Sequence, residues 1–291
     1  MADKIILLMN KTDFKKTYFI IALILFLIIE FPNFSHSKEI IGKEQFLLDT
    51  KEINLTLKDT KDINTLKKLL KEQSPRTIYL EQWITMEKGN KNLLKKLHKI
   101  TKKNDIKLFL FIGRDSWIGK RGVANALASF EQYGNYIDGL VLRTQPDKLN
   151  IWDKTDVNIQ AQILNQMLDA YSAIYIELKK HNKIFIAEFP FWYSDFQGPL
   201  KSFSQNVCDY TDKIIFLIDD TDKLESLDIK WNKITCRYSI DLTKKALGPT
   251  IEDTHSIYKS IKSRLAFYQN FSGFIVDSDY KKLIPNSGIT P

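Results

Sequence analysis

Carboxylates that follow short apolar runs are the residues of this sequence whose types could do chemistry. Glu188 lies near the end of the run 184–189, Glu81 follows Ile78-Tyr79-Leu80, and Asp277 follows the run 273–276. Two carboxyl groups can cleave a glycosidic bond when one is protonated and the other is ionised. Glu188 is therefore the candidate general acid/base, with Asp277 or Glu81 as the second carboxylate.

Aromatic and polar residues near the ends of the same runs could hold a sugar. Aromatic rings stack on the apolar C–H faces of a sugar, while carboxylate, amide and guanidinium groups bind its hydroxyls. The candidate substrate-binding residues are Trp192, Tyr193, Trp83, Trp117, Asp115, Arg143, Gln145, Asp220 and Arg237. Each of these alone is typical of an ordinary loop. The concentration of Trp83, Trp117, Trp152 and Trp192 near run ends is what favours a carbohydrate ligand.

Nothing in the sequence indicates a metal or a cofactor. His98, His181 and His255 lie in helix-like stretches and have the pattern of surface residues. Cys208 and Cys236 lack the spacing of a zinc site. No glycine-rich dinucleotide fingerprint follows the first strand, and there is no P-loop. We therefore expect no cofactor and no metal.

Short β-like runs alternate along the chain with helix-like runs, which implies parallel βαβ units. The predicted strands cover 46–48 or 53–55, 77–83, 106–112, 137–142, 183–189, 213–218, 233–238 and 273–276. The predicted helices cover 62–72, 90–103, 123–133, 157–180, 200–210 and 251–269. Eight units in about 250 residues predict a single-domain (β/α)8 TIM barrel, with the helix before the seventh strand missing or very short. A doubly wound open sheet would explain the alternation with fewer strands.

The first 37 residues have the order of a secretory signal. Lys11, Lys15 and Lys16 precede the apolar run 18–29, and small residues stand at the two positions that a signal peptidase inspects before residue 38. We therefore expect a signal peptide at 1–37 and the barrel at 38–291, in the periplasm or secreted. An uncleaved inner-membrane anchor at 18–34 is the alternative, and it would be the chain's only contact with a membrane.

Charge and cysteine usage fit an exported globular protein. The 291 residues are 44% hydrophobic and 27% charged, with a net charge of +8, which excludes a disordered chain. The basic residues are mostly lysines spread over helical faces, so we expect no nucleic-acid partner. Export would permit Cys208 and Cys236 to pair, but we expect two isolated buried thiols.

The segment Asp138-Gly139 to Pro146 resembles a fourth-strand motif of bacterial glycoside-hydrolase-like TIM barrels, distant relatives of the chitinase-like enzymes. That motif reads D-G-hydrophobic-H-hydrophobic-D-hydrophobic-E-P. The segments 184–192 and 273–276 are also similar to this group, and the resemblance spans roughly residues 77 to 281. It implies an (α/β) barrel with its site at the carboxyl ends of the strands.

The same motif is degenerate at its chemical positions. By alternation Val141, Arg143 and Gln145 share one side of the strand, where the motif has its His, Asp and Glu. The resemblance makes that Glu the general acid, and Gln145 cannot donate a proton as an acid does. Arg143 could instead lower the pKa of a neighbouring carboxylate or bind an anionic sugar bidentately.

Three hypotheses therefore stay open. The chain is an exported glycoside hydrolase with a rearranged carboxylate pair, a catalytically inactive barrel that binds a polysaccharide or cell-wall glycan, or a structural or partner-binding protein of the cell envelope. The fold favours an enzyme, and the substitutions in the motif disfavour it.

Overall fold

The computed structural model describes residues 52–55, 77–82, 90–196, 202–219, 231–243, 246 and 251–275. The chain forms two units, 1–42 and 43–291, and every described residue belongs to the second. The predicted signal or anchor and the predicted helix at 62–72 lie outside the described residues. Within the described part, no helix has both the length and the apolar character needed to cross a membrane.

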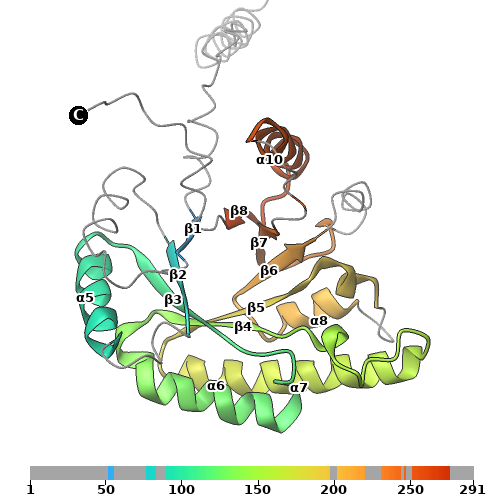
Figure 1. The fold of residues 1–291 in the computed structure, drawn as a ribbon, viewed down its shortest axis with the longest axis horizontal. Coiled ribbons are helices and arrows are strands. Elements are labelled where there is room, and N and C mark those ends of the chain that lie inside the picture. The colour runs from blue at the N-terminus through green and yellow to red at the C-terminus, as the bar shows by residue number, and fades with distance from the viewer. Residues whose placement is uncertain are drawn as a thin grey trace, which may run out of the picture. The chain divides into compact units, whose positions relative to one another are not determined.

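Eight parallel strands form one sheet, and each strand pairs with the next in the sequence (Figure 1). The strands are β1 (Glu52–Leu55), β2 (Thr77–Glu81), β3 (Lys107–Ile112), β4 (Gly139–Arg143), β5 (Ile184–Pro190), β6 (Lys213–Ile218), β7 (Arg237–Leu242) and β8 (Phe271–Ile275). The sheet curls so that its end strands, β1 and β8, also come into contact. This is the predicted TIM-barrel architecture.

On strands β2 to β6, alternate residues face two different apolar cores, as expected for a sheet buried on both sides. On β5, Phe185 and Ala187 belong to the larger core that the helices cover, whereas Ile186 belongs to a smaller core. The smaller core fills the inside of the curled sheet with Tyr79, Phe109, Phe111, Val141, Ile186, Ile215 and Ile275. Side chains on this same inner face of the strands, further along than the small core, therefore lie at the end of the barrel.

Five helices are described, all in the second unit: α5 (Asn90–Lys103), α6 (Gly119–Tyr133), α7 (Val157–Lys180), α8 (Phe203–Cys208) and α10 (Ile251–Leu265). α7 begins at Asp156, whose side chain accepts hydrogen bonds from the backbone N–H groups of residues 158 and 159. Its buried face packs on β5 and against α6, which lies beside it (Figure 1). The predictions of 90–103, 157–180 and 213–218 match the observed elements.

The predicted seventh strand, 233–238, is wrong, because the strand runs Arg237–Leu242. The carbonyls of residues 233–235 accept hydrogen bonds from the side chains of Gln205 and Asn270 and are not part of a strand ladder. Pairing with β6 starts only at Arg237, opposite Lys213. The residues around Ile234 have the sequence pattern of a short strand, but side chains from other elements bind their carbonyls.

Cys208 and Cys236 form a disulfide, which corrects the expectation of two isolated thiols. Cys208 is the last residue of α8 and Cys236 directly precedes β7, and their Cα atoms lie 5.2 Å apart. The two residues are 28 positions apart in the sequence, so their proximity depends on the barrel bringing α8 and β7 together.

Two aspartates at the amino-terminal ends of strands bind the backbone of the preceding strand. Asp138, just before β4, accepts a hydrogen bond from the Leu108 N–H of β3 at 2.8 Å. Asp212, just before β6, accepts one from the Phe185 N–H of β5 at 2.9 Å. We call these contacts strand clasps. They give Asp138 of the Asp-Gly motif a structural role at the end of the barrel opposite Arg143.

Candidate functional site

Arg143 gathers three carboxylates at the carboxyl-terminal end of the sheet. Its Nε and NH2 groups donate to the two carboxylate oxygens of Glu188, the NH2–Oε2 distance being 3.2 Å. Its NH1 group donates to Glu81 Oε1 at 3.2 Å, and its NH2 nitrogen lies 3.7 Å from Asp241 Oδ2. We call these four residues the Arg143 cluster.

The positions of the four residues follow from strand alternation and register. Arg143 pairs in register with Glu188, and both lie two residues beyond an inward-facing apolar residue of the small core. Glu81 ends β2, and Asp241 is the next-to-last residue of β7. Because the strands are parallel, their carboxyl ends meet at one edge and these inward side chains converge there.

Burial differs sharply within the cluster. The Glu188 side chain is 0% exposed, whereas Asp241, Glu81 and Arg143 are 16%, 21% and 32% exposed. Glu188 therefore lies at the bottom of the cluster, and the other three side chains share its solvent-facing side. A molecule arriving at the mouth would meet Arg143, Glu81 and Asp241.

β3 supports Arg143 from beneath and from the side. The Phe111 ring lies under the guanidinium, with 4.6 Å from its centroid to Cζ, a cation–π contact. Gly113 follows β3 with a φ of +120°, and a Cβ atom there would lie 2.1 Å from the Arg143 carbonyl oxygen. The absence of a side chain at Gly113 is thus a condition for the backbone position of Arg143.

Arg143 is a fixed positive charge in this cluster. Burial by itself would lower the pKa of Arg143, but the carboxylates of Glu188, Glu81 and Asp241 outweigh burial and hold the pKa above its ordinary value. The guanidinium therefore stays protonated at every pH at which the protein is folded. The carboxylates around it are attracted to a permanent cation.

This geometry argues against Glu188 as a general acid. A general acid must present a proton to the leaving oxygen of its substrate. Both Glu188 oxygens instead accept hydrogen bonds from Arg143, and the side chain is fully buried. Glu81 and Glu188 contact one guanidinium, so their carboxylates are on the order of 5–8 Å apart, a separation used by glycosidases, but the guanidinium lies between them.

Among the other predicted residues, Gln145 and Tyr193 are engaged elsewhere. Gln145 lies just past β4, is buried, and accepts a hydrogen bond from Lys148. Tyr193 is fully buried; it donates a hydrogen bond to the Asp147 carboxylate and accepts one from the Asp147 backbone N–H at 3.3 Å. Neither offers a free face to a ligand.

Trp192 keeps a partly exposed ring with aromatic support. Its centroid lies 4.5 Å from that of Tyr193 and 5.9 Å from that of Trp152, both in edge-on geometry. Trp152, which is buried, stacks on Tyr193 with 5.6 Å between centroids.

Asp115 and Trp117 follow β3 and are partly buried, without a described contact to the Arg143 cluster.

The remaining predicted residues are separated from the cluster or lie outside the described chain. Arg237 starts β7 and pairs with Lys213, the first residue of β6, so it stands at the opposite end of the barrel. Trp83, Asp220 and Asp277 lie outside the described residues.

Asp241 is the cluster residue that sequence reasoning missed. The seventh strand predicted at 233–238 ends before residue 241. A signal was present, since Arg237, Ser239 and Asp241 alternate with apolar residues, as expected for a strand with one polar face.

Among the described residues, no group of three or more His, Cys, Asp or Glu side chains is arranged to hold a metal ion.

Comparison with known proteins bears on the fold. No protein-family model and no curated protein sequence matches the chain. The YdjI aldolase from Escherichia coli K12 is 10% identical, with 82% of this chain and 80% of that chain covered and a TM-score of 0.50. A D-psicose 3-epimerase, solved in the presence of D-fructose, is 11% identical, with 78% of this chain and 84% of that chain covered and a TM-score of 0.47.

An exo-β-agarase is 9% identical, with 76% of this chain and 42% of that chain covered and a TM-score of 0.44. Such likenesses concern the fold alone, because one barrel fold hosts many chemistries. The chain is a TIM-barrel-like α/β protein, and these structures do not single out a glycoside-hydrolase-like family. What the chain does has to be argued from its own mouth residues.

Proposed function

We propose that this chain is an exported TIM barrel that binds a neutral carbohydrate at the mouth formed by Arg143, Glu81 and Asp241, without cleaving it through Glu188. The observation that carries the proposal is the bidentate pairing of Arg143 with the buried Glu188 at the centre of the mouth. It places a positively charged donor where the resembled motif has a carboxylate, two residues before the position of its general acid.

A polyol fits the chemistry of this mouth. Arg143 can only donate hydrogen bonds and ionised carboxylates can only accept them, whereas a sugar hydroxyl does both. Adjacent hydroxyls of one sugar could therefore bind Arg143 and a carboxylate together. An anionic ligand would meet the carboxylates of Glu81 and Asp241, with that of Glu188 buried behind them, which disfavours acidic sugars. The partly exposed Trp192 ring supports a stacking contact at the rim.

Two features support the proposed export. The sequence 1–37 has the order of a secretory signal. The Cys208–Cys236 disulfide is of a kind that persists in oxidising compartments. A cell fractionation that finds the folded protein in the cytoplasm would contradict this part of the proposal.

Binding of the full chain to a panel of neutral and acidic bacterial glycans, measured by calorimetry, tests the proposed function. Removing one charged acceptor in Glu81→Gln should weaken binding about tenfold. Glu131→Gln makes the same chemical change on the exposed surface of α6 and should leave the Kd unchanged. If no glycan binds, or if both variants bind like the parent, the carbohydrate proposal is wrong.

A second candidate is a glycoside hydrolase with a rearranged carboxylate pair, favoured by the partial exposure of both Glu81 and Asp241 beside one guanidinium. This candidate requires turnover of a glycan that Glu81→Gln and Asp241→Asn abolish. Turnover abolished by Glu188→Gln in a protein that stays folded would instead restore Glu188 as the acid. Binding without turnover rejects both enzyme versions.

A further inference from the structure

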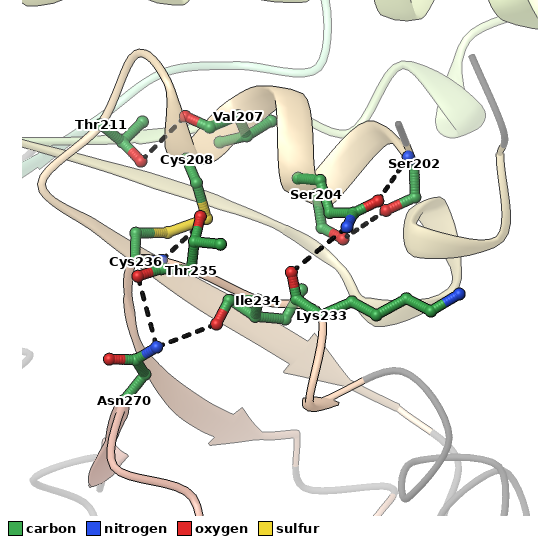
Figure 2. The surroundings of a disulfide bond; sticks show 11 residues. Ser202, Ser204, Val207, Cys208, Thr211, Lys233, Ile234, Thr235, Cys236 and Asn270 are labelled. Atoms are coloured by element: carbon green, nitrogen blue, oxygen red, sulfur yellow. Dashed lines mark hydrogen bonds between the residues drawn. A yellow bond between two sulfur atoms is a disulfide. The ribbon is translucent and has the colours of Figure 1, made fainter. Parts of the chain in front are cut away.

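The disulfide lies at the start of the strand that carries Asp241. Cys236 directly precedes β7, and Asp241 lies near the other end of the same strand. The Cys236 N–H also donates a hydrogen bond to Cys208 Sγ at 3.2 Å (Figure 2). The covalent bond therefore fixes the beginning of β7 to the end of α8.

Two side chains hold the segment before β7 in addition to the disulfide. The Asn270 amide, just before β8, donates to the carbonyls of Ile234 at 2.9 Å and Thr235 at 3.3 Å (Figure 2). Gln205 of α8 donates to the Lys233 carbonyl at 3.4 Å. Each of these hydrogen bonds contributes modestly by itself, whereas the disulfide joins the same segment to α8 covalently.

Pairing between β7 and β8 is interrupted close to the start of β7. The ladder runs regularly from β6 to β7, but the pairing of β7 with β8 has an irregularity between Tyr238 and Ile240. Such irregularities locally disrupt the ladder and leave fewer hydrogen bonds to hold the register. Beyond this point Asp241 pairs with Ile275 and reaches the guanidinium of Arg143.

We propose that the Cys208–Cys236 disulfide is a redox-sensitive fastener of β7 that controls the placement of Asp241 beside Arg143. A dithiol reductant attacks one sulfur, forms a mixed disulfide and then closes its own disulfide, so that two electrons and two protons pass to Cys208 and Cys236. The released segment before β7 then frays, and the β7–β8 pairing loosens while β4 and β5 stay paired. This inference does not depend on which ligand occupies the mouth.

Hydrogen exchange of the full chain, followed by mass spectrometry before and after reduction with dithiothreitol, tests the proposal. We expect the protection of backbone amides in 237–242 and 271–275 to fall about tenfold on reduction, with that in 139–143 and 184–190 unchanged. Cys208→Ser/Cys236→Ser should exchange like the reduced parent and should not respond to the reductant.

Asn270→Ala, with the disulfide intact, provides a variant that does not depend on the reduced protein. It removes two hydrogen bonds from the same segment, so it should lower protection in β7 to a lesser degree and make the disulfide react faster with dithiothreitol. Equal protection in the oxidised and reduced chains would overturn the proposal. A loss of protection spread uniformly over β4, β5, β7 and β8 would also overturn it, since it would make the disulfide a general staple.

Discussion

Arg143 determines how the mouth of this barrel is built, because one guanidinium contacts carboxylates from three other strands. A buried carboxylate that loses its only strong counter-charge becomes costly to the folded state. Loss of Arg143 would have this effect on Glu188, because the Glu188 side chain is fully buried and both of its oxygens accept hydrogen bonds from Arg143. The cluster therefore contributes to stability as well as to any ligand contact.

Arg143→Met should lower the free energy of unfolding by about 2–4 kcal/mol, a range reduced from that of a fully buried pair because Arg143 is partly exposed. Denaturant unfolding at neutral pH measures this. Arg143→Lys should cost less, since it keeps the charge and loses the bidentate geometry. The double variant Arg143→Met/Glu188→Met should recover part of the loss. Equal costs for the single and double variants would show that the ion pair is not responsible.

Gly113 provides a second residue-scale prediction, because its missing side chain makes room for the Arg143 carbonyl. Gly113→Ala should destabilise the fold by about 2 kcal/mol more than Gly119→Ala. Both glycines have positive φ, +120° and +56°, but a Cβ at Gly119 would meet its nearest neighbour at 3.7 Å and not at 2.1 Å. Thermal unfolding of the two variants separates steric contact from backbone preference, and equal losses would refute the steric argument.

At this scale the sequence could predict Glu81, Arg143 and Glu188 as mouth residues, because they end or continue clear apolar runs. It could not predict their chemistry. Whether Glu188 acts as an acid or as a partner of Arg143 depends on the register between β4 and β5, which places the two side chains opposite each other. Register is a tertiary property that a single strand's sequence does not contain.

Among the elements, the strand clasps stabilise the amino-terminal edge of the sheet. Asp138→Ala should destabilise the protein by about 1–3 kcal/mol, because it leaves the Leu108 N–H, in a fully buried residue, without its acceptor. Asp138→Asn keeps an oxygen acceptor and should restore most of the loss. Chemical denaturation of the three proteins checks this, and an Asn variant as unstable as the Ala variant would contradict the clasp.

Element boundaries were predictable where periodicity was strong and failed where side chains bind the backbone. The amphipathic pattern of 157–180 and the apolar run 213–218 were sufficient to predict α7 and β6. The start of β7 was not, because Gln205 and Asn270 bind the carbonyls of 233–235 from distant elements. The same long-range folding brings Cys208 to Cys236, and the same error removed Asp241 from the predicted site.

For the whole molecule, buried tyrosines set the response to alkaline pH. Burial is the main cause that raises the pKa of Tyr171, Tyr193 and Tyr238 above the ordinary value; Glu188 adds to it for Tyr171, Asp147 for Tyr193 and Tyr268 for Tyr238. As pH rises past about 10, the unfolded chain loses these protons before the folded chain does. Their contribution to stability is therefore complete below about pH 10 and is lost above it.

We expect the free energy of unfolding to fall steeply above about pH 10, with the phenolate absorbance of these tyrosines appearing only as the protein unfolds. Tyr171→Phe removes one buried hydroxyl that ionises only in the unfolded chain, so it should move this alkaline transition to higher pH. Phenolate absorbance that develops fully while the circular dichroism stays native would disprove this account.

The two strand clasps and the Asn270 contact each join one pair of neighbouring strands. Asp138 joins β4 to β3, Asp212 joins β6 to β5, and Asn270, just before β8, binds the residues that lead into β7. These contacts span 30, 27 and 36 residues, so each is local to one two-strand module. A circular permutant opened between modules, in the loop before α7, would keep all three contacts short-range. One opened between β5 and β6 would turn the Asp212 clasp into a contact between opposite ends of the chain, and it should fold more slowly.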